Sequence, residues 1–370
     1  MPSSESSLGL RSVDSSNRLV ITFLVDNTLE WFTKLPPGFT HELSQHLQNQ
    51  NPPLKTHPVT GVPVLDLNEF CCGAHGFSAL IETQISGEDA HLTLFDTGPD
   101  SLSLVRNVKA LQVPVDKITR VITSHWHADH TGGLLSFLEL RTGSKSECIV
   151  DCHPDRPISR GMARGAQPNM IFACLPDDPT FEEIEAAGGV VEKHAEGHAV
   201  ASGAVWVSGE IPRITSFEEG IPGAKRWVEE GGRGQWIDDE LILDERYAVI
   251  DVAGKGLVIF SACSHAGICN VVRDAVTKFS RPIHMIIGGL HLAPADSAVR
   301  IGPTIDFLSR QLIPAPNFVL PMHCSGFYFK VELEKALGDG CVPASTGMKV
   351  EISGDRELDR RLFPSTITIV

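Results

Sequence analysis

Short runs of apolar and β-branched residues recur along the chain, and each run ends abruptly in polar residues or glycine. Such runs predict strands that are buried on one or both faces. We expect strands at residues 18–25, 77–83, 91–98, 120–123, 148–152, 203–207, 246–252, 256–260, 282–287, 318–322, 348–352 and 366–370. Apolar residues at helical spacing predict helices at residues 102–111, from 134 onwards and at 331–337.

Three stretches lack this periodicity. Residues 1–17 are rich in serine and predict a disordered tail, which leaves residues 18–370 as a single domain because no low-complexity linker divides them. Residues 35–64 predict a long surface loop with three exposed, idle histidines, which are His41, His46 and His57. Residues 156–167 predict a mobile loop whose arginines either bind an anion or are solvated, namely Arg156, Arg160 and Arg164.

The densest chemistry follows the strand predicted at residues 120–123. Within six positions the chain carries His125, His127, Asp129 and His130, and a glycine pair follows them. Neutral imidazoles and carboxylates are the ligands that suit zinc and similar divalent metals. His125 and His127 are spaced to share one ion, and Asp129 with His130 can turn to a second, as in two-metal hydrolytic sites.

Charge and composition narrow the functional classes. The formal net charge of −15 over 370 residues argues against nucleic acid as a partner, because polyanions need a basic face. Nine cysteines without regular spacing argue against a disulfide framework and favour a reducing compartment. We see neither a secretory signal nor a membrane-spanning apolar stretch. We therefore expect a cytoplasmic protein with a small-molecule substrate, and the oligomeric state stays open.

Three motifs carry a resemblance to a known family. The His-x-His-x-Asp-His-Thr-Gly-Gly stretch at residues 125–133 resembles the signature of metallo-β-lactamase-fold hydrolases. Residues 208–218, with Gly-Glu-Ile-Pro-Arg, and residues 261–268 resemble motifs of the branch named after dihydropterin-ribofuranosylaminobenzene-phosphate synthases, with Ala262 in place of a usual glycine. The resemblance covers roughly residues 18 to 330 and implies an α/β fold, the four-layer αββα sandwich.

The same resemblance implies roles for residues outside the three-histidine stretch. Asp96, at the end of a predicted strand, is implied to lie behind residues 125–130, called the metal loop below, and to orient the ligands in it. The third ligand of the first metal is His265 or His198, with His265 preferred, and Cys263 is a further candidate ligand. His323 is expected on the second metal. The substrate pocket is expected to include His291, Arg213, Glu210 and, if it is not a ligand, His198, although Arg213 and Glu210 can instead pair with each other.

These features predict a metal-dependent hydrolase in which Asp129 is both ligand and catalytic residue. Two ions, expected to be Zn²⁺, would lower the pKa of a bound water and so supply hydroxide. Ring-opening of a lactam or a related cyclic ester is the leading hypothesis, and a phosphodiesterase or a dihydropterin-type synthase is the alternative. Iron-dependent oxygen-reducing relatives carry Glu where His127 stands, which argues against them. A non-catalytic, metal-stabilised binding protein is the remaining hypothesis.

Overall fold

Two large β-sheets form the centre of the computed structural model, which describes residues 13–49, 54–164, 167–294 and 297–368. The first sheet has the strand order β2 (Phe39–Thr40), β19 (Lys349–Ser353), β1 (Arg18–Val25), β3 (Ser78–Gln84), β4 (His91–Phe95), β5 (Ile118–Ile122), β6 (Cys148–Cys152), β9 (Gly189–Lys193). The second has the order β10 (His198–Val200), β11 (Val205–Val207), β14 (Ala248–Val252), β15 (Gly256–Phe260), β16 (Ile283–Gly289), β18 (Phe318–Met322).

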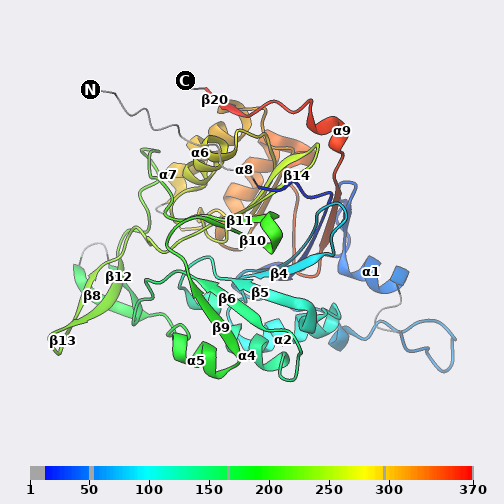
Figure 1. The fold of residues 1–370 in the computed structure, drawn as a ribbon, viewed down its shortest axis with the longest axis horizontal. Coiled ribbons are helices and arrows are strands. Elements are labelled where there is room, and N and C mark those ends of the chain that lie inside the picture. Colours follow the sequence, from blue (N-terminus) through cyan, green and yellow to red (C-terminus); the bar gives the residue numbers. More distant parts are fainter. Residues whose placement is uncertain (1–12, 50–53, 165–166, 295–296, 369–370) are drawn as a thin grey trace.

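The sheets pack face to face, and helices cover their outer faces (Figure 1). One core cluster joins the inner faces, with Phe23 and Ile122 from the first sheet against Phe260 and Met322 from the second. Two further clusters lie outside. The first sheet is covered by α2 (Ser101–Ala110), α4 (Leu134–Leu140) and α5 (Phe181–Ala186), and the second by α6 (Ile268–Phe279), α7 (Ala298–Asp306) and α8 (Phe327–Leu337). The four-layer αββα sandwich is therefore confirmed.

Parallel pairing brings the site together. Strands β4, β5, β6 and β9 run parallel, as do β15, β16 and β18, so their carboxyl ends share an edge of each sheet. Phe95 of β4 lies opposite Ile122 of β5, which places Asp96 beside the metal loop. Close approach at this edge requires a glycine, because a Cβ at Gly289 would overlap the Ala262 carbonyl oxygen and the Cys324 sulfur.

The prediction for residues 35–64 is wrong in part, because the segment contains β2 and the helix α1 (Glu42–Asn49). His41 and His46 are buried rather than exposed, while His57 is exposed as expected. His46 stacks on Phe70 and its Nε2 lies 3.3 Å from Glu42 Oε1. A helical turn that buries polar side chains against a partner distant in sequence leaves no apolar periodicity to detect.

The loop expected at residues 156–167 is wrong in part, because residues 156–159 lie in a loop but the segment from Arg160 to Arg164 is a strand. It contributes β7 (Arg160–Arg164) to a small sheet that projects from the body (Figure 1), in the order β13 (Arg233–Asp238), β12 (Ala224–Glu230), β7, β8 (Gln167–Cys174). Arg160 is buried rather than solvated, because its guanidinium pairs with Asp239 and Asp244. The side chain of Arg164 lies outside what the structure describes.

Both chain ends differ partly from expectation. Residues 1–12 of the predicted tail lie outside the described residues, but Val13 packs on the core and Ser16 bridges to Val252. The final strand is short: β20 (Thr366–Ile367) pairs with β17 (Leu312–Ile313), and residues 369–370 lie outside the described part. Two further short α-helices are α3 (Ala128–Thr131) and α9 (Arg356–Asp359). Within the described ranges, every helix is too short or too polar to cross a bilayer.

A buried carboxylate joins the edges of the two sheets. Asp151 Oδ1 accepts a hydrogen bond from Arg246 Nη1 at 2.8 Å, and its Oδ2 lies 2.9 Å from Arg120 Nη1 and 2.7 Å from His198 Nε2. Burial alone would raise the pKa of Asp151, but the His198 hydrogen bond and the Arg246 charge hold it below its usual value. The folded state therefore gains stability from ionised Asp151 at neutral pH, and that gain is lost as the pH falls.

We expect Asp151→Ala to lower the free energy of unfolding by about 3–5 kcal/mol, because it leaves the fully buried Arg246 without a counter-charge. Urea denaturation followed by circular dichroism measures this. Glu192→Ala is the matched control: its carboxylate also pairs with Arg120 but is partly exposed, so the loss should stay below about 1 kcal/mol. Equal losses in both variants would contradict the role of Asp151.

Candidate metal centre

The metal loop between β5 and α3 is held rigidly by groups from other parts of the chain. Trp126 is fully buried, its backbone N–H donates to Asp244 Oδ2 at 2.7 Å, and its indole N–H donates to the His153 carbonyl at 3.0 Å. Arg160 donates to the Trp126 carbonyl and pairs with Asp244. The histidines on either side of Trp126 are therefore pre-positioned before any ligand binds.

A first cluster consists of His125, His127 and His265. His125 Nε2 lies 2.9 Å from His127 Nδ1 and 3.1 Å from His265 Nε2. Burial lowers the pKa of His125 and His265 and lowers that of His127 to about 3, so the three rings are neutral at pH 7. Ring nitrogens this close suit a tetrahedral zinc ion with ligands at about 2.0–2.1 Å.

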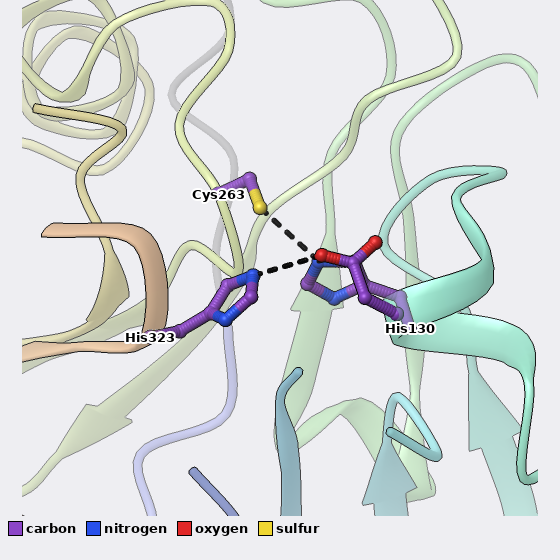
Figure 2. A group of neighbouring side chains, drawn as sticks. His130, Cys263 and His323 are labelled. Atoms are coloured by element: carbon purple, nitrogen blue, oxygen red, sulfur yellow. Dashed lines mark hydrogen bonds and ion pairs between the residues drawn. The ribbon is translucent and has the colours of Figure 1, made fainter. Parts of the chain in front are cut away.

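A second cluster consists of Asp129 and His130 from α3, Cys263 from the loop after β15 and His323 from the end of β18. Figure 2 shows His130, Cys263 and His323 converging from three parts of the chain. His130 Nε2 lies 3.1 Å from Cys263 Sγ and 3.6 Å from Asp129 Oδ2, and His323 Nε2 lies 3.1 Å from Asp129 Oδ2. The rings of His125 and His130 have centroids 4.4 Å apart, so the two clusters adjoin. Imidazole, thiolate and carboxylate donors are a zinc-type ligand set.

Asp96 orients one ligand of each cluster. Its Oδ2 lies 2.8 Å from His130 Nδ1 and accepts from Ser124 Oγ at 2.7 Å, while its Oδ1 accepts from the Ser124 backbone N–H. Since Ser124 Oγ gives its proton to Asp96, it accepts one from His125 Nδ1 at 2.9 Å. Both rings then carry a proton on Nδ1, and His125 turns an Nε2 lone pair toward its cluster. Burial would lower the pKa of His130, but the Asp129 and Asp96 carboxylates raise it to about 9, so a cation at the second cluster would have to displace the proton on His130 Nε2.

Comparison with known proteins agrees with this geometry. A family model described as the metallo-beta-lactamase superfamily matches residues 75–215. A protein of Methanocaldococcus jannaschii, described as 7,8-dihydropterin-6-methyl-4-(beta-D-ribofuranosyl)-aminobenzene-5'-phosphate synthase, is 30% identical over 260 residues, which cover 68% of this chain and 81% of the relative. The chain belongs to the metallo-β-lactamase superfamily, in the branch of that synthase.

A solved structure described as a metal-dependent hydrolase of the beta-lactamase superfamily has the same fold. It superimposes with a TM-score of 0.60 at 20% identity, covering 90% of this chain and 99% of that one. At this level of identity the likeness concerns the fold alone. The resemblance predicted from the sequence motifs is thus confirmed both for the superfamily and for the branch.

The sequence offered two candidates for the third ligand of the first cluster, His265 and His198. Of these two, the structure brings only His265 to the metal loop. His198 begins β10, where its Nε2 lies 2.7 Å from Asp151 Oδ2 and its ring stacks on His194 at 3.8 Å. Those three residues form a further cluster, but the Asp151 oxygens there already accept from Arg120 and Arg246. His198 therefore takes part in the contact between the two sheets.

The residues predicted to line the substrate pocket differ in whether they lie beside a cluster. The ring of His291 lies 4.6 Å from that of His265, with a positive φ of 46°, so it adjoins the first cluster. Arg213 donates from Nη1 to the His265 carbonyl at 3.2 Å and from Nη2 to the Leu241 carbonyl. It supports the His265 loop and makes no hydrogen bond to the exposed Glu210 within the described residues.

Sequence reasoning missed two residues beside the second cluster. Asn27 Oδ1 lies 3.2 Å from His323 Nδ1, and Asn27 Nδ2 donates to the His323 carbonyl at 3.1 Å. His75 has its ring 4.7 Å from that of His323. The signals available were weak: Asn27 ends the first strand run, and His75 precedes a glycine immediately before a predicted strand.

We expect Asp96→Asn to weaken zinc binding by about 10–100-fold, because the amide nitrogen would face His130 Nδ1 and favour a proton on Nε2 instead. Competition with a chromophoric chelator measures the affinity. Asp116→Asn, at an exposed carboxylate on the opposite end of β5, is the matched control and should leave the affinity unchanged. Wild-type affinity in the Asp96 variant would contradict its orienting role.

Proposed function

We propose that this chain is a dinuclear zinc enzyme that hydrolyses a small molecule, with ring-opening of a lactam or related cyclic ester as its leading activity. The observation that carries the proposal is the adjoining pair of clusters, in which seven ligand atoms from the ends of separate strands converge. A non-catalytic metal site is disfavoured, because among the described residues the first cluster offers three protein ligands. Three protein ligands with an open fourth position are typical of catalytic zinc.

The electrostatics of His323 and Asp129 support a cation at the second cluster. Burial lowers the pKa of His323, so its ring is neutral, and the protein holds its Nε2 3.1 Å from the Asp129 carboxylate. Burial would raise the pKa of Asp129, but His130 and His323 hold it well below its usual value, so it is ionised. A lone pair and a carboxylate at this distance repel each other unless a cation lies between them.

Different residues would hold the two ions and face the substrate. Bound zinc supplies Lewis acidity and lowers the pKa of water toward neutrality. His125, His127 and His265 would hold the first ion, and Asp129, His130, Cys263 and His323 the second. The Asp129 side chain is 26% exposed, whereas those of His130 and His323 are fully buried, so Asp129 faces the approaching substrate.

A synthase is the second candidate function. The 30% identity to a protein described as a dihydropterin-linked phosphate synthase supports it, and the same pair of cations could activate either kind of substrate. The net charge of −15 favours a small neutral substrate over an extended polyanion.

Metal analysis tests the dinuclear centre. We expect about two zinc ions per chain by inductively coupled plasma mass spectrometry, and about one for His265→Ala, because the first cluster then keeps two ligands. His198→Ala is the control and should keep two ions, since that ring pairs with Asp151. Loss of zinc in the His198 variant with retention in the His265 variant would reverse the assignment.

Activity on a substrate panel tests the reaction. The purified zinc protein should hydrolyse a member of a panel of lactams, lactones, thioesters and phosphodiesters, and His125→Ala or His323→Ala should lower kcat/KM by at least about 1,000-fold. His57→Ala, at an exposed histidine, should leave the rate unchanged. Selective phosphodiester cleavage would overturn the lactam hypothesis, and condensation of a pterin substrate without hydrolysis would favour the synthase.

A further inference from the structure

We propose that His75 is a substrate-binding residue whose Nε2–H donates a hydrogen bond to a carboxylate or carbonyl oxygen of the substrate, beside the second cluster. This inference rests on the proposed function, because it assumes that a cation at the second cluster holds another part of the same molecule.

His75 lies at the mouth of the site. Its side chain is 69% exposed, yet its Nε2 lies 3.9 Å from Asp129 Oδ2. The fully buried ring of His323 lies behind it, at a centroid distance of 4.7 Å. A molecule that reached the second cluster from solvent on the Asp129 side would therefore pass the His75 ring.

The backbone holds His75 in this place. The following residue, Gly76, packs so closely on the metal loop that a Cβ there would overlap the Asp129 carbonyl oxygen and come within 2.6 Å of Pro99 Cδ. The next N–H, of Phe77, donates to the same Asp129 carbonyl at 3.3 Å. The His75 segment is thus built against the residue that closes the second cluster.

Asn27 determines which ring nitrogen of His75 carries the proton. The His323 carbonyl can only accept, so the Asn27 side-chain atom 3.1 Å away must be the amide nitrogen Nδ2. That same NH2 group has a second hydrogen, directed at His75 Nδ1 at 3.1 Å, which must therefore accept it. In the neutral ring the proton then lies on Nε2.

The Asn27 amide sets opposite hydrogen-bonding roles for His323 and His75. Asn27 Oδ1 accepts from His323 Nδ1, so His323 turns a lone pair toward the cluster. His75 instead presents an N–H beside it, and the Asp129 Oδ2 atom 3.9 Å away is too far to accept a hydrogen bond from it. An N–H donor at this position fits an oxygen acceptor on the substrate.

Two probes on the Co²⁺-substituted protein test the proposal. Mercaptoacetate carries a thiolate for the metal and a carboxylate for His75, whereas ethanethiol carries the thiolate alone, and visible absorption of Co²⁺ reports the binding of each. We expect His75→Leu to weaken mercaptoacetate binding by roughly tenfold or more, the effect of one hydrogen bond to a charged group, and to leave ethanethiol binding unchanged.

Further variants separate the possible outcomes. His75→Gln should restore most of the mercaptoacetate affinity, because its amide N–H can replace Nε2–H, and His57→Leu should bind both probes normally. Equal weakening of both probes in His75→Leu, or no weakening of either, would overturn the role of His75 while leaving the metal centre intact. Failure of the unaltered protein to bind Co²⁺ would instead overturn the proposed function, and this inference with it.

Discussion

The mutual repulsion of electron-rich atoms governs this site. Imidazole nitrogens, a carboxylate and a cysteine sulfur lie about 3 Å apart, in positions that the surrounding fold enforces. Buried polar groups normally sit next to a complementary partner, because an unpaired one costs several kcal/mol (roughly 2–7). Here the packing of the sandwich brings like groups together, and a bound cation would be the partner that makes the arrangement favourable.

Buried carboxylates behind the site position the residues of both clusters. Asp96 accepts from Ser124 and His130 and so sets the orientation of ligands in both clusters. Glu245 accepts the backbone N–H groups of His265 and Ala266 at 2.7 and 2.6 Å, and burial raises its pKa to about 7. Four residues around the site have left-handed backbone, namely Asp96, Ser264, His291 and His323. Such strain is typical of functional sites whose surroundings over-determine their geometry.

The superfamily explains why the reaction is harder to assign than the site. Its fold holds the cations at the edge of two sheets, and the chemistry that they provide is common to many substrates. Selection then depends on residues at the mouth, which here include a donor, His75, and a second histidine, His291, at the opposite cluster. The relative described as a synthase shares this fold at 30% identity, so the reaction cannot be read from the fold.

The sequence by itself determined the parts of this protein that depend on neighbours along the chain. The loop from His125 to His130 and most strand positions follow from local spacing and from apolar runs of the right length. The superfamily follows from the resemblance of the motif at residues 125–133. Tertiary structure alone decided between His265 and His198, because that choice depends on the register of β10 and β15 in a sheet assembled from distant segments. It also decided that His46 and Arg160 are buried, since the ring of His46 stacks on Phe70 and Arg160 pairs with Asp244, both distant in the sequence. The proton positions of His75 and His323 depend in the same way on one amide from the first strand end, which no periodicity in the sequence records.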